Sequence, residues 1–290
     1  MDRKTKRIGI LGRVGVGKSI IASNLSEALV REGYKVLLIG TDISLSSTLL
    51  VRGFADIPSV LQDYREKYSI RLQDYIIKSQ IGVYCMELGS IEPGSGCLAK
   101  GLSHIDEMLT AQGVLEEYQI DYILYDIAGD VACTGFILPI REGVMDQCLI
   151  ITNGNMASLS TANTLLSGIT KKGLIPSNTC LVGNLSDVFH TRSFLTEYAE
   201  IVNIPILSFI EFSPIMRDSY LAEKTIYQIN PESSMVEAFR DMALSMIDME
   251  EKTKMKPFEQ RSLLQWQQAW KKKELDYNRG IIDVDYSSNI

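Results

Sequence analysis

The sequence predicts an α/β fold, a mostly parallel β-sheet with helices on both faces, and three observations lead to this prediction. Short apolar, β-branched runs alternate with helical stretches along the 290 residues, which is the pattern of βαβ units. The composition is globular, with 46% hydrophobic and 22% charged residues, so the chain can bury a sizeable core. The first apolar run leads directly into a glycine-rich loop and a helical pattern. Such sheets bind ligands at the carboxyl ends of their strands, and functional residues are therefore expected in the loops after strands.

Strands are expected where aliphatic and β-branched residues form short runs. In chain order they are Ile8–Leu11, Val36–Ile39, Val83–Leu88, Tyr122–Tyr125, Cys148–Thr152, Cys180–Val182 and Ile204–Phe209. Helices are expected in the stretches between them. In chain order they are Lys18–Glu32, His104–Glu117, Ser158–Lys171, Phe194–Val202 and Met235–Met249. Gly33 stands where a helix C-cap belongs, because glycine tolerates the left-handed conformation that ends helices.

The end of the chain has a different pattern, so we expect residues 1–250 to form the ligand-binding domain and residues 251–290 a C-terminal helical extension. An apolar stripe at helical spacing is formed in the extension by Leu263, Leu264, Trp266 and Trp270. The preferred interpretation is a helix packed on its own domain. A role in docking a partner or wrapping a dimer is the alternative.

Charge and cysteine content argue against several classes of protein. The formal net charge of −7 disfavours a general nucleic-acid binder, which needs lysine and arginine to neutralise phosphates. No apolar run approaches the roughly 20 residues of a membrane span, and residues 1–7 contain no signal-peptide core. Five cysteines without a dense framework fit a reducing compartment better than a secreted disulfide scaffold. We therefore expect a cytoplasmic protein with neither a membrane span nor a nucleic-acid partner.

The loop after the first strand carries the strongest motif. It matches the phosphate-loop pattern G-x-x-x-x-G-K-S/T at every position and reads Gly12-Arg13-Val14-Gly15-Val16-Gly17-Lys18-Ser19. Its glycines let backbone N–H groups turn toward phosphate oxygens, while Lys18 supplies a charge and Ser19 a hydroxyl for Mg²⁺. A chance glycine-rich turn is the competing interpretation, but the flanking strand and helix argue against it. The motif predicts a P-loop NTPase fold that binds ATP or ADP with Mg²⁺, with residues 1–250 as the ATPase domain.

Two aspartates at strand ends are candidates to complete this nucleotide site. Asp126 ends the apolar strand Tyr122–Tyr125 and resembles a Walker B carboxylate, which holds the Mg²⁺ shell. Asp42 follows Val36–Ile39 and is a candidate for orienting the attacking water. Each has an ordinary alternative as a cap or turn aspartate, and that alternative has more weight for Asp42.

The five cysteines fall into two groups. Those in or beside apolar strands are interpreted as small buried core residues, and they are Cys85, Cys148 and Cys180. Cys97 and Cys133 instead lie in glycine-containing loops after predicted strands. A closed iron–sulfur or zinc site needs about four thiolates, so a two-fold dimer would supply the missing pair. Cys133 also follows Asp126 by seven residues, and a loop of that kind would couple hydrolysis to a metal site.

These residues, taken together, resemble the nitrogenase iron protein family, which includes the NifH, BchL and ChlL proteins. Three blocks carry the resemblance in the same order and spacing along residues 7–250. They are Gly12–Ser19, then Glu92-Pro93-Gly94-Ser95-Gly96-Cys97-Leu98-Ala99-Lys100-Gly101, and then Tyr125-Asp126-Ile127-Ala128-Gly129-Asp130-Val131-Ala132-Cys133-Thr134-Gly135-Phe136 followed by Pro139-Ile140-Arg141-Glu142. Joint agreement over such a length is far more specific than any one motif.

The resemblance implies a homodimer with one 4Fe-4S cluster on its two-fold axis, held by Cys97 and Cys133 of each subunit, with MgATP at the subunit interface. It implies an upstream ferredoxin or flavodoxin and a separate catalytic protein that accepts the electrons, while ATP hydrolysis gates docking and transfer. It also implies that Ile20 joins the phosphate loop in binding nucleotide and that Asn184 contacts the base. The residues expected to carry hydrolysis are Lys18, Asp42, Asp126 and Asp130.

The chain departs from the family pattern around the nucleotide. Arg13 stands where the family usually has lysine, and Ile20 where it has threonine. Switch I, usually Asp-Pro-Lys-Ala-Asp-Ser-Thr, reads Asp42-Ile43-Ser44-Leu45-Ser46-Ser47-Thr48. Lys100 replaces a frequent arginine, and the Pro-Arg-Asp near the base is replaced by Glu211-Phe212-Ser213. These departures predict a divergent branch with altered coupling of ATP hydrolysis.

Three functions compete at this point. The leading one is an ATP-gated electron donor, because Cys97 and Cys133 lie in matching contexts. The second is a maturation ATPase that carries or inserts a metal or an iron–sulfur cluster, and the lost switch I carboxylate keeps it open. The third is a positioning or partitioning ATPase, which would have no use for the two loop cysteines.

Overall fold

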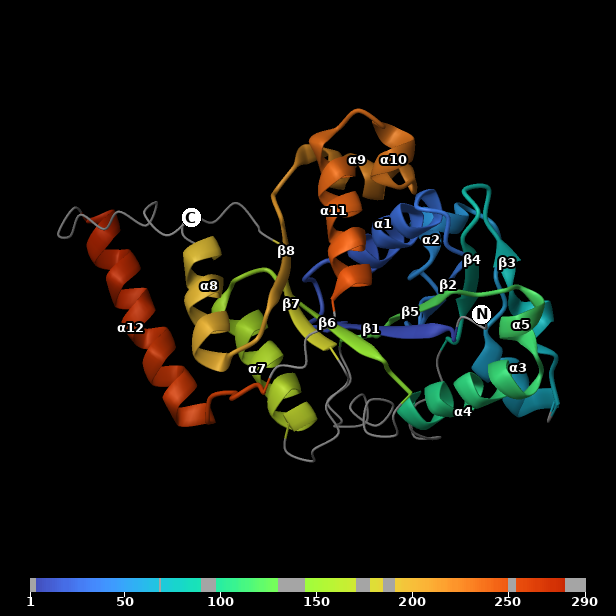
Figure 1. Cartoon of the computed structure of the whole chain (residues 1–290), viewed down its shortest axis with the longest axis horizontal. Helices are drawn as coiled ribbons and strands as arrows, with labels where there is room; N and C mark the ends of the chain where they lie inside the picture. The colour runs from blue at the N-terminus through green and yellow to red at the C-terminus, as the bar shows by residue number, and fades with distance from the viewer. Residues whose placement is uncertain are drawn as a thin grey trace.

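The computed structural model describes residues 4–67, 69–89, 98–129, 144–170, 178–184, 191–249 and 254–279. Within these ranges the chain forms an eight-stranded sheet with the order β3-β4-β2-β5-β1-β6-β7-β8 (Figure 1). The strands are β1 (Lys6–Gly12), β2 (Val36–Gly40), β3 (Ile77–Lys78), β4 (Tyr84–Glu87), β5 (Tyr122–Asp126), β6 (Gln147–Thr152), β7 (Asn178–Asn184) and β8 (Ile206–Ile210). All neighbouring strands are parallel except β3, which pairs antiparallel with β4. The predicted mostly parallel sheet is therefore confirmed.

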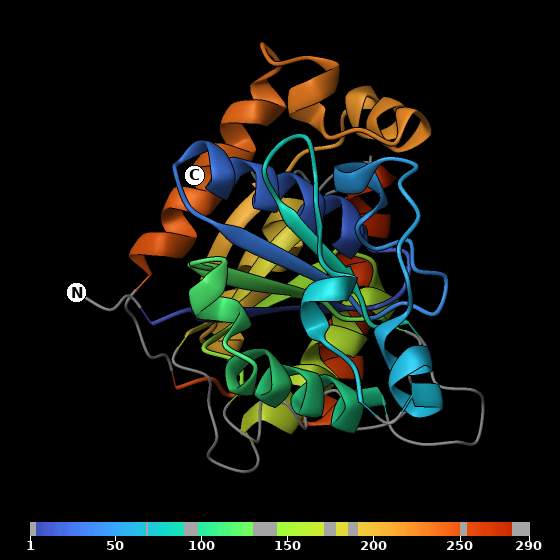
Figure 2. The ribbon, with the colours of Figure 1, turned by 90° about the vertical axis from the view of Figure 1, so that its right-hand side faces the viewer.

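Helices cover both faces of this sheet (Figure 2). They are α1 (Lys18–Arg31), α2 (Leu49–Arg52), α3 (Val60–Lys67), the 3₁₀ helix η1 (Leu72–Tyr75), α4 (Leu98–Ala111), α5 (Val114–Glu117), α7 (Met156–Thr170), α8 (Thr191–Val202), α9 (Pro214–Ala222), α10 (Ile226–Ile229), α11 (Ser234–Asp248) and α12 (Gln260–Asn278). Val36 and Leu38 of β2 join the core under α1 and α11, whereas Leu37 and Ile39 join the core under α4, α7 and α8. This two-residue alternation is what a strand buried on both faces requires.

Glycines set two of the helix ends. α1 ends before Gly33, whose φ of 91° allows its N–H and that of Tyr34 to bond back to the helix carbonyls of Val30 and Leu29. The helix predicted over His104–Glu117 is instead two helices, α4 and α5. Gly113, with a φ of 67°, separates them, because a left-handed residue cannot continue an α-helix.

The C-terminal helix α12 lies alongside α8 (Figure 1). The rings of Phe194 and Trp266 stack with centroids 4.8 Å apart. Trp266 donates from Nε1 to Glu197 at 2.8 Å, and Gln267 donates to the carbonyl oxygen of Met156 at 3.0 Å. α12 is therefore anchored to α7 and α8 by aromatic packing and hydrogen bonds, while the division of the chain near residue 250 stays a prediction.

Removing the Trp270 ring is expected to destabilise the protein substantially. Trp270 is 5% exposed and packs edge-on to Phe194 at 5.4 Å, so Trp270→Ala should lower the free energy of unfolding by about 3 kcal/mol through lost burial and a cavity. Leu264→Ala is the control, because Leu264 is 50% exposed and should cost less than about 0.5 kcal/mol. Equilibrium urea unfolding measures both. Equal losses in the two variants would contradict this packing.

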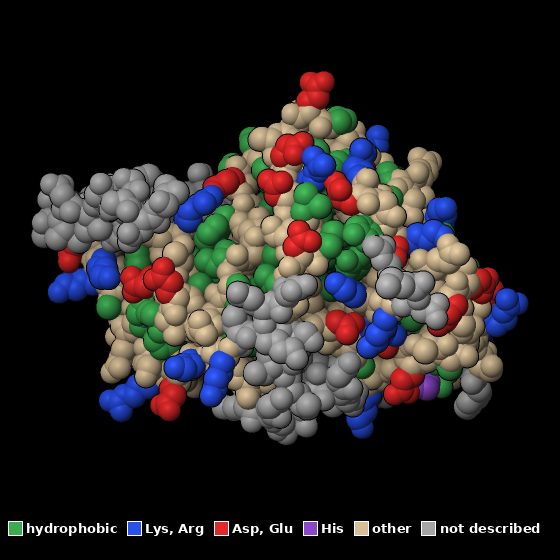
Figure 3. Space-filling view, viewed as in Figure 1, with side chains coloured by type: hydrophobic (Ala, Val, Ile, Leu, Met, Phe, Trp, Pro, Cys, Tyr) green, Lys and Arg blue, Asp and Glu red, His purple; other side chains and the backbone are tan. Residues whose placement is uncertain are grey.

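The face of the molecule in Figure 3 is mixed in charge. Lysine and arginine side chains are interspersed with aspartate and glutamate on the face in Figure 3. None of the helices in the described ranges combines the length and apolar character that a membrane crossing needs.

Candidate functional site

The glycine-rich loop between β1 and α1 adopts backbone conformations that favour glycine. Gly12, Gly15 and Gly17 have φ values of 153°, 80° and 89°. Residues with a side chain rarely adopt such values. A Cβ at Gly12 would collide with the carbonyl oxygen of Ile151, and one at Gly17 would collide with the side chain of Asn184. Because α1 begins directly after the loop, its first-turn N–H groups lie at the loop's end, as phosphate binding requires.

Two side chains at the start of α1 are placed for phosphate and metal. Lys18 is 8% exposed and donates from Nζ to the carbonyl oxygen of Arg13 at 3.2 Å, which holds its ammonium group across the loop. Ser19 donates from Oγ to Oδ2 of Asp126 at 2.6 Å. α1 thereby brings Ser19 to the carboxyl end of β5. The Walker B-like strand and the phosphate loop, distant in sequence, meet at this pair.

Asp126 is a buried carboxylate, and one of its two oxygens accepts no hydrogen bond from the described residues. Asp126 is 2% exposed, and that oxygen is Oδ1. Burial raises the pKa of Asp126, while the hydrogen bond from Ser19, the charge of Lys18 and the nearby hydroxyl of Ser47 lower it. An unsatisfied buried carboxylate oxygen is costly, and Mg²⁺ binds such oxygens. The pair of Ser19 and Asp126 therefore fits the Mg²⁺ that accompanies a P-loop nucleotide.

Asp42 lies on the loop that follows β2. Its Oδ2 accepts hydrogen bonds from Oγ of Ser44 at 2.6 Å and Oγ of Ser46 at 3.3 Å, and the two hydroxyls lie 2.6 Å apart. The serines that replace the family's lysine and aspartate thus turn inward onto Asp42. The charge of Asp42 also helps to raise the pKa of Asp126, so both carboxylates belong to one site.

Thr41 joins the loop after β2 to the segment after β5. Its N–H and its Oγ1 donate to the carbonyl oxygen of Asp126 at 3.2 Å and 3.1 Å, and the N–H of Ala128 donates to its Oγ1 at 2.9 Å. One residue further on, a Cβ at Gly129 would lie 2.6 Å from the backbone nitrogen of Val14. The loops after β1, β2 and β5 therefore touch one another, although nothing in their sequences alone predicts the role of Thr41.

Asn184 ends β7 and lies against the phosphate loop. Its Nδ2 donates to the carbonyl oxygen of Val16 at 2.8 Å, and its side chain occupies the space that a Cβ at Gly17 would need. Asn184 thus supports the loop directly. Its predicted contact with the base stays a prediction, as does a nucleotide contact for Ile20, which is half-buried on α1.

Three predicted site residues lie outside the described residues. They are Cys97, Asp130 and Cys133. Within the described part of the chain, no three or more histidine, cysteine, aspartate or glutamate side chains gather as a metal site would require. The cluster ligands therefore stay a prediction from sequence and resemblance.

The other three cysteines are fully buried, as predicted. Cys85, Cys148 and Cys180 are each 0% exposed and without a disulfide. Burial raises the pKa of Cys85 and of Cys180 to about 12 and that of Cys148 further still. Thiols held protonated in this way are poor metal ligands, so these positions act as small apolar side chains.

Glu87 at the end of β4 is a site residue that the sequence reasoning missed. It is 0% exposed, and its Oε1 accepts hydrogen bonds from N and Oγ1 of Thr48 at 2.7 Å and 2.8 Å. Burial raises the pKa of Glu87 to about 7, with Asp126 raising it further and Thr48 and Arg52 opposing. A glutamate at the carboxyl end of an apolar strand was the available signal, because parallel strands place all such ends at one edge of the sheet.

Stability should depend on pH through Glu87. Its pKa of about 7 in the folded protein exceeds the ordinary 4.5, so the folded state keeps a proton that the unfolded state releases between these values. Stability contributed by this proton is present below pH 4.5 and lost as the pH rises to about 7, by up to about 3 kcal/mol. Glu87→Gln should flatten the fall in unfolding free energy between pH 5 and pH 8, measured by urea unfolding. The exposed Glu107→Gln is the control, and an unchanged slope in Glu87→Gln would refute the assignment.

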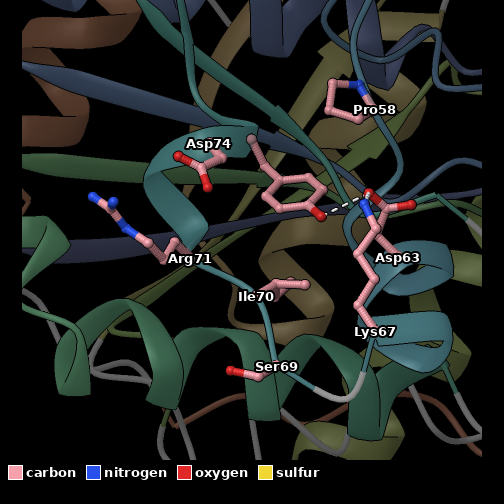
Figure 4. A pocket seen from close by; sticks show the side chains of 8 residues that line it. Pro58, Asp63, Lys67, Ser69, Ile70, Arg71 and Asp74 are labelled. Atoms are coloured by element: carbon pink, nitrogen blue, oxygen red, sulfur yellow. Dashed lines mark hydrogen bonds and ion pairs between the residues drawn. The ribbon is translucent and has the colours of Figure 1, made fainter.

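A hollow of about 410 Å³ lies between α3 and η1 (Figure 4). Its central charges are paired, since Asp63 accepts hydrogen bonds from Tyr75 at 2.7 Å and Lys67 at 2.6 Å. The hydrogen bond from Lys67 lowers the pKa of Asp63. None of the predicted site residues lines this hollow, so it is separate from the candidate nucleotide site.

Comparisons with known sequences give consistent matches. Residues 6–272 match the family model described as 4Fe-4S iron sulfur cluster binding proteins, NifH/frxC family. Nitrogenase iron protein 2 of Paenibacillus durus is 31% identical over 294 aligned positions, covering 100% of both chains. Nitrogenase iron protein 2 of Methanothermobacter thermautotrophicus is 33% identical over 256 positions, covering 88% of this chain and 94% of the relative.

Comparisons with solved structures identify the fold. The cell division ATPase MinD of Pyrococcus furiosus has a TM-score of 0.67 at 21% identity, covering 84% of this chain and 99% of its own. A ParA family ATPase from Chlorobium tepidum has a TM-score of 0.64 at 19% identity, covering 83% of this chain and 99% of its own. At these identities the likeness shows the fold alone. It is the predicted P-loop NTPase fold.

Proposed function

Because the chain belongs to the NifH/frxC family of 4Fe-4S iron sulfur cluster binding proteins, we propose that it is an ATP-gated electron donor. Two copies form a homodimer that holds one 4Fe-4S cluster and binds MgATP at the subunit interface. The dimer receives electrons from a ferredoxin or flavodoxin and passes them to a separate catalytic protein in the cytoplasm. The reduced substrate is bound by that partner.

The observation that carries this proposal is the connection between Asp126 and the chain toward Cys133. Asp126 pairs with Ser19 at the phosphate loop, and the segment that follows it contacts both Thr41 and the phosphate loop. Four residues after Gly129 the sequence reaches Cys133. A change at the γ-phosphate would therefore shift the start of a segment that bears a thiolate, in the manner of a GTPase switch.

The described residues would divide the work of hydrolysis among them. The phosphate loop and Lys18 would hold the β- and γ-phosphates, while Ser19 and Asp126 would hold Mg²⁺ through oxygen. Asp42, together with Asp130, would orient the attacking water. The cluster, when bound by Cys97 and Cys133, supplies one-electron chemistry.

Exposed apolar side chains support a subunit interface beside this site. Val14 on the phosphate loop is 46% exposed, Ile43 on the loop after β2 is 68% exposed, and Phe54 after α2 is 86% exposed. Val14 and Ile43 are on the loops after β1 and β2, so a second subunit seated there would cover apolar side chains at the candidate site. A two-fold interface there would also bring the second pair of thiolates that four-coordinate cluster binding needs.

The altered switch I supports a divergent coupling of hydrolysis. Ser44 and Ser46 hydrogen-bond to Asp42, where the family pattern offers a lysine and a second carboxylate. Arg13 also replaces the usual lysine, and a planar, always-charged guanidinium binds phosphate differently from an ammonium group. Turnover at the ordinary family rate with an established catalytic partner would argue against this divergence.

A maturation ATPase that carries or inserts a metal or a cluster is the second candidate. The observation that favours it is Ser46, because the missing carboxylate weakens the expected link between Mg²⁺ and switch I. A labile cluster, or metal transfer to an apoprotein, would support this candidate over the electron donor.

The first test is the iron and acid-labile sulfide content of the dimer after strictly anaerobic purification, with an EPR spectrum after dithionite reduction. About four irons per dimer with a reduced-cluster signal are expected. A protein without iron would overturn the electron-donor proposal and leave a nucleotide switch or metal carrier built on the same fold.

A further inference from the structure

Glu87 and Arg52 are joined through one threonine. Oε1 of Glu87 accepts hydrogen bonds from both N and Oγ1 of Thr48. The same Oγ1 accepts from Nε of Arg52 at 3.0 Å. The hydroxyl proton of Thr48 therefore points to the Glu87 side chain, and a lone pair of the same oxygen points to the Arg52 guanidinium. These two hydrogen bonds fix the orientation of the hydroxyl.

The remaining donors of Arg52 hold the loop on the other side. Nη2 donates to the carbonyl oxygen of Leu45 at 2.6 Å, and Nη1 donates to the carbonyl oxygens of Gly53 and Ala55. Leu45 has a φ of 53°, an unfavourable conformation for a leucine. The hydrogen bond from Arg52 to the carbonyl oxygen of Leu45 helps to hold that conformation. One guanidinium thus ties the middle of residues 42–48 to the chain beyond α2.

The place of the Glu87 side chain is built into the sheet. Its Oε2 lies where a Cβ at Gly40 would be, so glycine at the end of β2 makes room for it. Oε2 accepts no hydrogen bond from the described residues. A buried carboxylate of this kind adds little net stability, because apolar side chains of similar volume usually serve a core at least as well. The burial of Glu87 is better explained by its hydrogen bonds with Thr48, which hold Thr48 in position.

The loop held in this way carries candidate site residues at its start. Thr41 bonds to Asp126 at the start of the loop, and Asp42 follows it with its carboxylate bonded to Ser44 and Ser46. Thr48 closes the loop, and Glu87 and Arg52 hold it there. The fixed geometry of residues 42–48 thus depends on two residues outside the loop.

We propose that Glu87 and Arg52, acting through Thr48, form a latch that holds residues 42–48 in position for ATP hydrolysis. This inference rests on the proposed ATPase function. In the latch, Glu87 is a positioning residue that supplies an acceptor to Thr48, and Arg52 supplies the bond to Leu45. The latch stabilises a loop in which Ser46 stands where the family pattern has a carboxylate.

The test compares variants that differ only in the latch bonds. Glu87→Met removes the acceptor at similar volume, Glu87→Gln keeps it, and Arg52→Met removes the guanidinium. Glu87→Met and Arg52→Met should lower kcat for ATP by at least about tenfold with KM changed by less than about threefold. Glu87→Gln should stay within about threefold of the natural protein. A side chain with only a structural role would not lower kcat while leaving KM nearly unchanged.

A double variant and a control sharpen this comparison. Because both residues act through Thr48, Glu87→Met combined with Arg52→Met should be no slower than the worse single variant within about threefold. Arg261→Met is the matched control, since Arg261 is exposed on α12, and it should leave kcat unchanged. Additive losses, or unchanged kcat in both single variants, would overturn the latch.

Hydrogen exchange separates this inference from the proposed function. The amide of Thr48 is protected by its bond to Glu87, so in Glu87→Met and Arg52→Met the exchange across residues 42–48 should be about tenfold faster. If the natural protein hydrolyses no ATP, the proposed function fails while exchange still tests the latch. If it hydrolyses ATP and exchange in the loop is unchanged in both variants, the latch alone fails. Arg52 is only half-buried, so Arg52→Met carries the test if Glu87→Met does not fold.

Discussion

Replacing Lys18 with methionine is expected to lower the rate of ATP hydrolysis by about 10²- to 10³-fold. The ammonium group of Lys18 is already held over the loop by the carbonyl oxygen of Arg13, so it needs little reorganisation to meet the β- and γ-phosphates. Methionine keeps the length of the side chain and removes the charge. Steady-state release of phosphate measures the rate, and binding of a fluorescent ATP analogue reports whether affinity falls with it.

The control for this variant is Lys254→Met, which removes a charge from an exposed side chain. It should leave hydrolysis unchanged. Lys18→Met should stay folded in thermal unfolding, because methionine fills a similar volume at a position that is 8% exposed and burying it carries no charge penalty. If Lys18→Met hydrolysed ATP at the natural rate, the phosphate loop would not be the site of hydrolysis.

Serine at Cys97 or at Cys133 is expected to abolish the stable iron content of the dimer. Each substitution would remove two of about four thiolates from a subunit-bridging cluster. Serine has nearly the same size as cysteine, so loss of iron would report ligation rather than packing. The measurement is iron and acid-labile sulfide after anaerobic purification, with EPR of the dithionite-reduced protein. Both variants should lose the reduced-cluster signal.

Cys148→Ala and Cys180→Ala provide the matched controls. Both side chains are 0% exposed, and burial raises both pKa values well above the ordinary range, so neither thiol is suited to bind iron. Both variants should keep the iron content of the natural protein. Iron that survives in Cys97→Ser and Cys133→Ser would exclude the proposed ligand set, overturn the electron-donor proposal and leave a nucleotide switch or metal carrier built on the same fold.

Much of the fold and of the candidate nucleotide site could be predicted from the sequence. The phosphate loop was recognisable because its chemistry is carried by eight adjacent residues, Gly12–Ser19, and the structure gives three of its glycines positive φ. The parallel sheet was recognisable because its strands are apolar throughout, as burial on both faces requires. The proposed role of Asp126 followed from its place at the end of such a strand, and its hydrogen bond with Ser19 supports the proposal.

The errors have identifiable causes. The helical pattern over His104–Glu117 continued through Gly113, whose left-handed conformation no periodicity records, so two helices were predicted as one. The short helices α2, α3, α9 and α10 were missed because fewer than three turns carry too little periodicity. Glu87 was missed because a single glutamate after an apolar strand has no motif, and its partner Thr48 lies 39 residues away.

The sequence by itself determined the chemistry that adjacent residues carry: the phosphate loop, the strand-end aspartates and the family to which the chain belongs. Tertiary structure decided which distant groups meet. It placed Thr41 against Asp126, 85 residues away, Asn184 against Val16, 168 residues away, and Glu87 under the loop that Arg52 also holds. The physical reason is that parallel strands end at one edge of the sheet. Local propensity specifies where each strand ends. The pairing order and register of the strands specify which residues of other strand ends lie beside it.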